Sequence, residues 1–591
     1  MKKRAAKLLA IVMTLSMVLT ACSTTAPPPI SDRPAPTPVE PVVGTPVADS
    51  NSRPDISGVK QVFNWNLVTE PKTLDPGLNS AVDGSHIIMN LYEGLYRDRG
   101  NGFPEPAMAQ SVNISPDGLV YTFQLRDANW SDGVPVRAQD FEFSWKRAIN
   151  PATASEYGYI FDPVKNATLI NSSSPNADGT FSDADGNIVL NEEGNPITID
   201  DIGVTAQDDK TLVVTLERPT GYFLDLMDFA TYVPLREDVV GDDTTGVWAK
   251  DPQRVVSNGP FKLTGYVLGE SFTLTKNEFY WNVGGVSLET VNVRFITDSS
   301  TALTAFRAGE IDYSEQFPVA EMNALVRAGE VQVFDYIGTY FFVLNTRTEA
   351  IDNVDVRHAL AKAINRQDIA NMRGPGNLPA TGFVPFGFLK PNGEDFRAAA
   401  GDYGISIIAD PQGALELFEK AGYTIIDGKV QDFPRLEILL NSGSNHEEIA
   451  QLVQNDLREI GIDVDLRVQE WAVMQDTRRN LDYNGFVRHG WIGDFLDPQT
   501  FLEIFLSDST QSGNGYANPA YDEVTRAGMN ATGQERFDNF VKAEGILMDD
   551  GYVIPVSYYA LPALIAEHFN NFYMKPTGKL WLGDAFMTER R

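Results

Sequence analysis

Two spacings of hydrophobic residues alternate along the chain from about residue 60 onward. Runs rich in β-branched and aromatic residues predict strands at Val120–Leu125, Thr211–Leu216 and Ser271–Thr275. Apolar residues three and four positions apart predict helices at Val356, Leu360, Ala363 and Ile364 and at Ile449, Leu452, Val453 and Leu457. The second of these helices should end before Gly461, because glycine favours a helix end. Strands and helices that interleave in this way predict a mixed α/β fold, and no 20–50-residue repeat indicates a solenoid or propeller.

The segment 165–200 interrupts this pattern with many Asn, Ser, Asp and Gly residues. Asp178, Asp183 and Asp185 lie close together within it. A calcium-binding loop is one interpretation, but the full EF-hand pattern with its terminal Glu does not fit. Turns between short hairpins are favoured instead.

The N-terminus has the organisation of a secretion signal. Basic residues come first, followed by an apolar run from Leu8 to Ala21, which is too short to span a bilayer. The run ends in Leu19-Thr20-Ala21-Cys22, which resembles a bacterial lipobox, and this resemblance implies cleavage before Cys22 and lipidation of its thiol. An ordinary signal with a chance cysteine is the alternative.

Residues 22–57 are predicted to form a tether behind the lipidated Cys22. Residues 23–57 contain nine prolines and no apolar period, which favours an extended, polyproline-like chain. Cys22 is the only cysteine, so an intrachain disulfide and a multi-cysteine zinc site are both excluded.

Composition narrows the function classes further. The chain has 47 Lys+Arg against 80 Asp+Glu, a formal net charge of −33, and 43% hydrophobic residues. It is therefore expected to fold and to have no nucleic-acid partner, since phosphate binding needs clusters of Lys and Arg. Cleavage before Cys22 would remove only basic residues from the charge count, so the mature chain would be more acidic still.

Catalytic signatures are missing from the sequence. No G-x-S-x-G, H-E-x-x-H, P-loop or G-x-G-x-x-G motif opens a helix, and His446-Glu447 has no second His four residues on. We therefore expect no enzyme, no catalytic residue, no metal site and no cofactor, although an envelope enzyme remains an alternative.

The segment Arg488–Phe495 places a cation, two aromatic residues and an acid within eight residues. Beside a cleft, Asp494 could bind an amine and Arg488 a carboxylate. From the spacing alone, a structural Arg–Asp surface pair with a core Trp is the favoured interpretation. Farther upstream, Asn445 is a predicted helix N-cap with Glu448 at the third helical position, which puts His446 in the first turn, where N–H groups attract anions. A solvent-facing His446 is the alternative.

A set of short segments, in this order and at these distances, makes the chain similar to the oligopeptide-binding proteins of ABC importers. The likeness extends from about Val62 to about Tyr573. Its segments are Thr69–Pro76, Asn90–Leu95, Trp130–Val136, Asp140–Phe141, Ser144–Trp145, Asn258–Leu263, Asn277–Trp281, Gly309–Asp312, Val356–Leu360, Ala363–Arg366, Gly490–Asp494 and Asp497–Pro498.

The resemblance implies an α/β, two-lobed clamp like that of periplasmic binding proteins, with an extra domain inserted in the first lobe. Lobe I would comprise residues 58–92, 236–338 and 560–591, the extra domain residues 93–235, and lobe II residues 339–559. The resemblance also implies two extended crossings between the lobes. These are Val333–Tyr336 and Val553–Val556, which are apolar and rich in strand-forming residues.

The resemblance also implies a ligand site for peptides. In the family, the Asp of the W-x-x-D motif takes the peptide α-amino group, and that residue is Asp494 here. Trp491 and Phe495 would wall the site, Arg488 would meet the carboxylate of a short peptide, and His446 that of a longer one. The remaining implied contacts are Arg478, Tyr157 and the backbone at Ser80 and Val82.

Two departures from the family pattern concern the same region. Ser80 stands where some members have a ligand-facing Glu, which changes the charge balance of the site. Gly338 and Ile492 stand where Gram-negative relatives have paired cysteines, so that disulfide cannot form.

These expectations describe a lipid-anchored, monomeric protein on the outer face of the cytoplasmic membrane. Its partners would be an oligopeptide ligand, the permease subunits of an ABC transporter and, through the N-terminal lipid, the membrane. Three alternatives remain open: a binder of the same fold for an oligosaccharide or metal chelate, a peptide-pheromone receptor, and the envelope enzyme named above.

Overall fold

The computed structural model describes residues 55–98, 104–390, 392–442, 445–509 and 515–590. The predicted signal peptide 1–21, the predicted lipidation site Cys22 and the predicted tether up to residue 54 lie outside these residues and stay predictions. Among the described residues, no helix combines the length and the apolar character needed to cross a bilayer.

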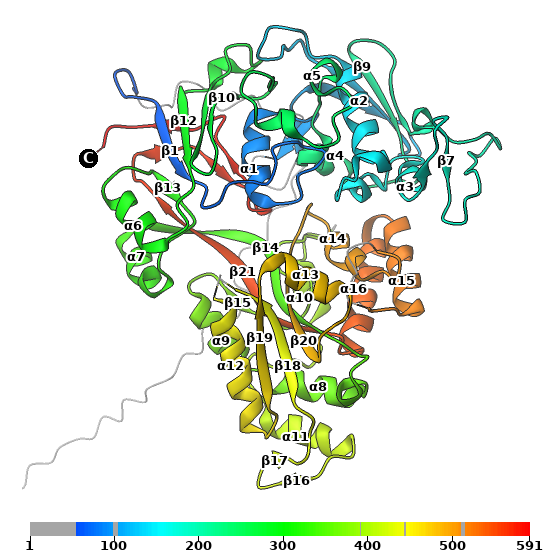
Figure 1. The fold of residues 1–591 in the computed structure, drawn as a ribbon, viewed down its shortest axis with the longest axis vertical. Helices are drawn as coiled ribbons and strands as arrows, with labels where there is room; N and C mark the ends of the chain where they lie inside the picture. Colours follow the sequence, from blue (N-terminus) through cyan, green and yellow to red (C-terminus); the bar gives the residue numbers. More distant parts are fainter. Residues whose placement is uncertain (1–54, 99–103, 391, 443–444, 510–514, 591) are drawn as a thin grey trace, which may run out of the picture. The chain divides into compact units, whose positions relative to one another are not determined.

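One 11-stranded sheet organises the described chain (Figure 1). Its strand order is β10-β11-β12-β1-β13-β21-β14-β20-β18-β19, with β15 paired to β21. The bounds on one side are β10 Phe261–Val267, β11 Ser271–Lys276, β12 Thr290–Arg294, β1 Val62–Asn66 and β13 Tyr313–Ser314. Those on the other side are β20 Gly485–Ile492, β18 Leu436–Asn441, β19 Val464–Gln469 and β15 Leu378–Pro379.

Two long strands join the two halves of this sheet. β14 (Val331–Leu344) and β21 (Val553–Ile565) pair with each other in antiparallel orientation, from Val331 opposite Leu564 to Val343 opposite Val553. Both predicted crossing segments, Val333–Tyr336 and Val553–Val556, lie in these strands. Each half of the sheet is thus attached to the other through paired backbone.

The first half of the sheet is covered by one hydrophobic cluster, which we call the N-terminal core. It contains Phe63 and Trp65 of β1 together with Phe123 of a separate four-stranded sheet. That second sheet has the order β4-β5-β9-β8. Its bounds are β4 Ala109–Ile114, β5 Val120–Leu125, β9 Thr211–Thr215 and β8 Val204–Ala206. The predicted strands at 120–125 and 271–275 are confirmed, and the one at 211–216 is confirmed except for its last residue.

Alternation along β14 separates two further cores. Tyr340, Phe342 and Leu344 point to one face of the sheet, and Phe341 and Val343 point to the other. The first set packs under α12 (His446–Glu459) and the second under α16 (Gly533–Asp549). In Figure 1, α12 and α16 lie on opposite sides of these strands. Burial on both faces explains why this part of β14 is a continuous apolar run.

Both predicted helices are present. The spacing from residue 356 lies in α8 (Val354–Ala363), with Ile364 as its C-cap, and the spacing from residue 449 lies in α12, which ends before Gly461. Ile449, Val453 and Leu457 are fully buried, as an amphipathic helix on a sheet requires.

The segment 165–200 contains one short helix, α3 (Ala167–Asn171), and otherwise consists mainly of short hairpins and turns, as predicted. β6 (Ser174–Pro175) pairs with β7 (Phe181–Ser182). The carboxylate of Asp178 accepts hydrogen bonds from Thr180, and that of Asp183 accepts them from Asn187. These carboxylates serve their own turns, so the turn interpretation is confirmed.

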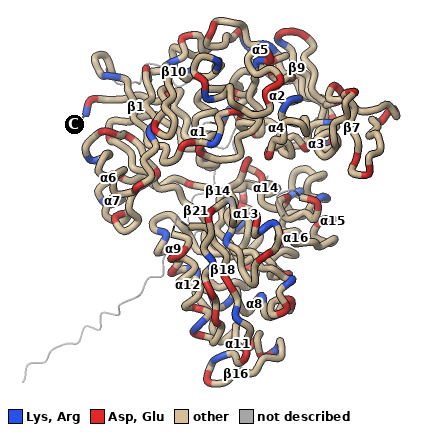
Figure 2. Tube along the Cα trace, in the orientation of Figure 1, with Lys and Arg blue, Asp and Glu red and all other residues tan. Residues whose placement is uncertain are grey.

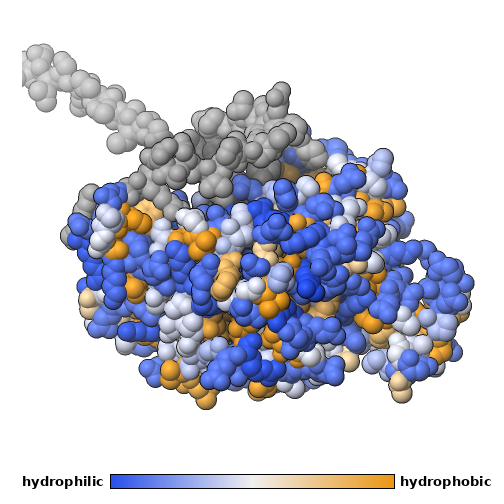
Figure 3. All heavy atoms as spheres, turned by 90° about the horizontal axis from the view of Figure 1, so that it is seen from above, coloured by the Kyte–Doolittle hydropathy of each residue, from blue (hydrophilic) through white to orange (hydrophobic). Residues whose placement is uncertain are grey.

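Charged residues are spread over the described chain. Acidic and basic positions are interspersed along the whole trace (Figure 2). On the face seen in Figure 3, hydrophobic residues are scattered among hydrophilic ones. The acidic excess is therefore mostly distributed surface charge, which favours solubility.

A buried ion pair fastens residues 383–403 to α16. The Glu544 carboxylate, fully buried, accepts hydrogen bonds from Arg397 at 2.5 Å, from the Phe383 N–H at 2.7 Å and from the Tyr403 hydroxyl at 2.8 Å. Loss of the Glu544 carboxylate would leave the Arg397 guanidinium, which is also buried, without a counter-ion.

We therefore expect Glu544→Ala to lower the free energy of unfolding by about 3–5 kcal/mol, because an unpaired charge stays buried. Urea unfolding monitored by circular dichroism measures the change. Glu535→Ala, on the exposed face of the same helix, is the matched control and should change stability by less than about 0.5 kcal/mol. Equal effects of the two substitutions would contradict the structural role of Glu544.

Candidate functional site

Asp494 lies just beyond the end of β20, and its backbone is fixed there. Its N–H donates to the Thr500 hydroxyl at 2.9 Å, and the preceding Gly493 N–H donates to the Ile337 carbonyl at 2.8 Å. The Asp494 carboxylate accepts one hydrogen bond on each oxygen, from the hydroxyls of Tyr157 and Tyr159, both at 3.0 Å. The acid is thus held by residues more than 330 positions away in the sequence.

The two tyrosines come from a short helical turn, η4 (Gly158–Phe161), and from the residue that precedes it. Their rings stack at 5.6 Å, and the Tyr157 ring packs against Phe229 at 4.9 Å. The structure brings Tyr157 and Asp494 together, as the sequence predicts. Tyr159 is not among the residues predicted from the sequence, although the sequence contains the Tyr157-Gly158-Tyr159 spacing.

Burial dominates the electrostatics of this group. It raises the pKa of Asp494, while Lys579 and the two tyrosine hydroxyls act in the opposite direction. Burial and the Asp494 charge together hold the pKa values of Tyr157 and Tyr159 well above the usual range, so both hydroxyls stay protonated donors at neutral pH. Burial also lowers the pKa of Lys579 to about 8.

A cavity of about 30 Å³ lies beside the Asp494 carboxylate. This volume is close to that of one water molecule or one ammonium group. Its lining is strongly charged and comprises Asp98, Pro104, Asp225, Asp228, Phe229, Asp494, Phe495, Leu496, Lys575, Thr577 and Lys579.

The two aromatic residues expected to wall the site differ in their surroundings. Phe495 lines this small cavity and is 5% exposed, with its ring stacked on Tyr222 at 4.5 Å. Trp491 is half-buried in β20, opposite Thr339 of β14, and its indole N–H has no hydrogen-bond partner among the described residues. Phe495 therefore packs beside Asp494. Trp491 instead has an indole N–H group without a hydrogen-bond partner among the described residues.

A second group forms around the ring of Tyr340. The guanidinium of Arg488 lies 5.2 Å above this ring, that of Arg373 lies 5.4 Å from it, and the His446 ring is 5.7 Å away. Arg488 also donates to the Asn441 side chain at 3.3 Å. Neither arginine has a carboxylate partner within the described part of the chain. The group therefore carries two positive charges that the described chain does not compensate.

His446 adds a neutral donor or acceptor to the Tyr340 group. Burial lowers its pKa to about 3, and the positive charges of Arg488 and Arg373 act in the same direction. Its Nδ1 atom is buried without a hydrogen-bond partner in the described residues. His446 is the first residue of α12, as predicted, and Asn445 is the N-cap. Asn445, however, has a left-handed backbone and makes no side-chain capping bond.

Arg478 lies apart from this group. It belongs to α13 (Trp471–Arg479) and hydrogen-bonds with His489, whose ring stacks on Phe341 at 4.8 Å. Successive residues of a strand face opposite sides, so His489 and Arg488 lie on different faces of β20. Burial lowers the pKa of Arg478 to about 10, which leaves it charged at neutral pH.

Ser80 and Val82 make no hydrogen bond with the other predicted residues in the described chain. Ser80 is exposed, and Val82 begins α1 (Val82–Leu91) after an extended Ala81. The Ala81 carbonyl accepts from the side chains of Asn79 and Ser85, each at 3.0 Å. Gly338 and Ile492 are direct partners in the β14–β20 ladder.

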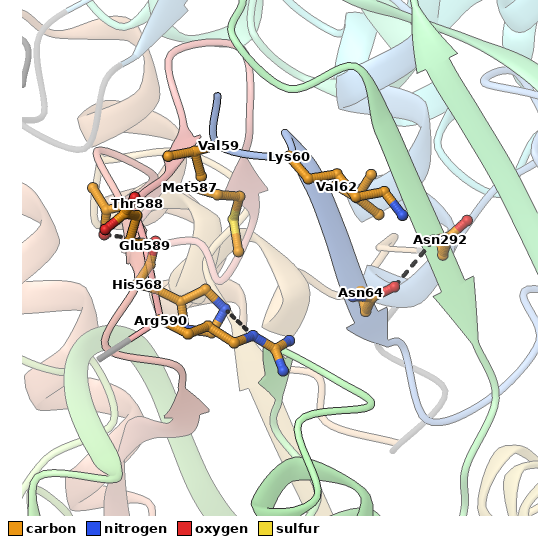
Figure 4. Close-up of a pocket in the computed structure, with 10 residues that line it drawn as sticks. All are labelled: Val59, Lys60, Val62, Asn64, Asn292, His568, Met587, Thr588, Glu589 and Arg590. Atoms are coloured by element: carbon orange, nitrogen blue, oxygen red, sulfur yellow. Dashed lines mark hydrogen bonds between the residues drawn. The ribbon is translucent and has the colours of Figure 1, made fainter. Parts of the chain in front are cut away.

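A larger cavity, of about 580 Å³, lies elsewhere (Figure 4). Its lining comprises Val59, Lys60, Val62, Asn64, Asn292, His568, Met587, Thr588, Glu589 and Arg590. His568 and Arg590 donate to the buried Asp312 carboxylate at 3.0 and 3.2 Å. None of the predicted site residues lines it, and two of its basic groups already have a carboxylate partner, so we place the candidate site at Asp494 and Tyr340.

Several residues of these groups were not found from the sequence. They are Tyr159, Arg373, Tyr340, His489 and Lys579. Each can be identified only from the residues that surround it in the structure. None stands in a short sequence motif that distinguishes it from other residues of its type.

Comparisons with known proteins identify the family. Residues 104–513 match the family model of bacterial extracellular solute-binding proteins, family 5 Middle. The oligopeptide-binding protein OppA of Bacillus subtilis (strain 168) is 33% identical over 538 residues, which cover 89% of this chain and 93% of that protein.

Two solved structures are similar over nearly their whole length. Listeria monocytogenes OppA bound to peptide has a TM-score of 0.74 and 27% identity, covering 90% of this chain and 100% of that one. The Haemophilus influenzae OppA complex with RPPGFSPFR has a TM-score of 0.72 and 29% identity, covering 90% and 99%. Structures of this family are two-lobed and of mixed α/β type, which confirms the predicted fold class. This chain belongs to the bacterial extracellular solute-binding proteins of family 5.

Proposed function

We propose that this protein is a lipid-anchored, extracytoplasmic solute-binding protein that captures oligopeptides between two lobes and delivers them to an ABC transporter permease. The observation that best supports the proposal is that one short segment, Arg488–Asp494, contains two groups of opposite charge. Within the described residues, the Asp494 carboxylate has hydrogen bonds only from uncharged hydroxyls, and Arg488, six residues earlier, has no carboxylate partner. Such a pair suits the two charged ends of a peptide. The printed names of the relatives, oligopeptide-binding proteins, support the same ligand class.

The strand order supports the division into lobes that the sequence predicts. We assign residues 58–92, 236–338 and 560–591 to lobe I, 93–235 to an extra domain and 339–559 to lobe II. In this assignment, β14 and β21 are the only long strands whose residues contribute to cores on both sides of the boundary, within the described chain. A small change of twist in these two strands would open or close the lobes.

In this proposal, Asp494 receives the peptide α-amino group. An ammonium group has three donors, and a desolvated carboxylate is the acceptor that favours it most. Tyr157 and Tyr159 keep the carboxylate in place, since their hydroxyls occupy one position on each oxygen and leave the others free. Because the site is small and largely removed from water, the interaction is stronger there than at the surface.

Arg488 and Arg373, with His446 beside them, would receive the peptide carboxylate. Guanidinium groups bind carboxylates in a bidentate manner, and the Tyr340 ring holds both in place. Neutral His446 would contribute a hydrogen bond without a charge. Arg478, on the other face of β20, would act on the ligand only indirectly, through His489.

The peptide backbone would lie between these ends in an extended form. Binding of main-chain groups is independent of sequence, which a carrier of many peptides requires. Ser80 and Val82 are the proposed backbone partners, and the free indole N–H of Trp491 is a further donor. Side chains of the ligand would then sit in hydrated space.

Protein purified under native conditions should carry short peptides, and Asp494→Asn should lose most of them. The substitution keeps the shape and one acceptor oxygen for a tyrosine hydroxyl but removes the charge, so binding of a free amine should weaken by about 10–100-fold. Native mass spectrometry detects the bound species. Asp482→Asn, an exposed acid on the same lobe, is the matched control and should retain them.

The same spectra distinguish the alternatives. An oligosaccharide or metal chelate would indicate a non-peptide binder, a single tightly held peptide would indicate a pheromone receptor, and cleaved products would indicate an enzyme. Folded wild-type protein that binds none of tri-, tetra- and penta-alanine in calorimetry would contradict the proposed function.

At the other end, Arg488→Met should reduce the preference for a free carboxylate over a C-terminal amide by about 10-fold or more. In wild-type protein this preference should stay constant between pH 7 and pH 5. His446, with a pKa of about 3, remains neutral throughout, and a peptide carboxylate with a pKa near ~3.5 remains ionised. Calorimetry of acid and amide peptide pairs measures the preference. A several-fold rise toward pH 5 would show that His446 gains its proton there.

Membrane attachment is proposed to depend on Cys22. Lipidation of this thiol would anchor the chain after the signal has been removed, and the Pro-rich residues 23–57 would hold the body away from the bilayer. We expect Cys22→Ala to move the mature protein from the membrane fraction to the soluble fraction, without loss of peptide binding. Immunoblotting of fractionated cells tests this; equal membrane association of both proteins would contradict the anchor.

A further inference from the structure

Lys579 is a buried cation without a direct partner. The residue is 7% exposed, and its ammonium group makes no ion pair and no side-chain hydrogen bond among the described residues. The ammonium lies 4.8 Å above the Phe229 ring. A buried charge in this state is costly, so an acceptor nearby would be expected to balance it.

A neighbouring lysine, Lys575, has the ion-pair partner that Lys579 lacks among the described residues. Lys575 and Lys579 flank the turn between β23 (Tyr573–Met574) and β24 (Leu580–Trp581), where the Lys575 N–H donates to the Lys579 carbonyl at 3.0 Å. Lys575 forms an ion pair with Asp228. The two lysines lie on the same turn, but the side chain of Lys575 reaches a carboxylate partner and, within the described chain, that of Lys579 does not.

What Lys579 faces is the small cavity beside Asp494. Both residues line it. They are also connected through packing: Phe229, under the Lys579 ammonium, packs on Tyr157, whose hydroxyl donates to Asp494. Among the described residues, the one other basic residue that lines this cavity is Lys575, which already has its carboxylate partner.

The cavity is small and lined by charged groups. Among the described residues, the carboxylates of Asp98, Asp225, Asp228 and Asp494 line it together with two lysines. The cavity volume, about 30 Å³, fits one ammonium group. An arriving ammonium would therefore share the Asp494 carboxylate with Lys579.

We infer that Lys579 is the resident counter-ion of Asp494 and that the amino group of the ligand competes with it for this one carboxylate. This inference rests on the proposed function and adds to it a residue that sets how strongly the protein prefers a free N-terminus. Without ligand, the positive charge of Lys579 lowers the pKa of Asp494 and so opposes the effect of burial. With ligand, the ammonium groups of Lys579 and of the ligand repel each other across the cavity. This repulsion limits how much the amine contributes to the binding free energy.

The effect on stability follows from the same geometry. Lys579→Met removes a buried charge that has no direct partner, and methionine is of similar length and apolar. It also takes the counter-charge away from the buried Asp494 carboxylate, so its melting temperature should fall, but by less than that of a variant that breaks a direct ion pair. Lys575→Met is the matched comparison: it leaves Asp228 buried and unpaired, so its melting temperature should fall.

The test uses tri-, tetra- and penta-alanine, each with a free and an N-acetylated terminus, against wild-type protein and Lys579→Met. The ratio of dissociation constants, acetylated over free, reports the preference for an amine. We expect this ratio to rise about tenfold in Lys579→Met through tighter binding of the free peptides. Binding of the acetylated peptides should change by less than about twofold, since they bring no competing charge.

The outcomes separate this inference from the proposed function. If wild-type protein binds neither form of any peptide, the proposed function fails. If it prefers free peptides but Lys579→Met leaves the ratio unchanged or lowers it, Lys579 is not the competing cation, and only the inference fails. Lys579→Gln, which keeps a polar side chain without the charge, should give the same direction of change and serves where the methionine variant is poorly folded.

Discussion

The burial of the Asp494 carboxylate against two tyrosine hydroxyls is the interaction on which the account of this protein depends. It joins a loop after β20 to a turn more than 330 residues earlier in the chain. A carboxylate removed from bulk water but bonded only to uncharged hydroxyls is a strong site for a cation. Before a ligand arrives, the positive charge of Lys579 across the small cavity compensates the negative charge of Asp494.

The sheet explains why the two ends of a ligand could be bound by one stretch of chain. β20 pairs with β14, and its residues Arg488 and His489 face opposite sides. Arg488 meets Tyr340, Arg373 and His446 on one side, while His489 meets Phe341 and Arg478 on the other. The strand then ends, and the following loop carries Asp494 away to the two tyrosines. Strand alternation and strand termination thus distribute one short motif over three environments.

Much of the architecture could be predicted from local patterns. The strands at 120–125 and 271–275 and the helices from residues 354 and 446 follow from the spacing of apolar residues. The contact between Tyr157 and Asp494 agrees with the family motif. Arg373 and Lys579 could not be found in this way, because their roles arise from the ring of Tyr340 and from a cavity. The missing capping bond of Asn445 likewise depends on its left-handed backbone, which no composition rule indicates.

The central claim is that Asp494 binds the amino end of a peptide. A crystal structure of residues 55–591 with tri-alanine tests it most directly. We expect the α-amino nitrogen about 2.7–2.9 Å from an Asp494 carboxylate oxygen, with the peptide carboxylate directed toward Arg488. A peptide bound with its amino group elsewhere, for example in the larger cavity beside His568 and Arg590, would contradict it.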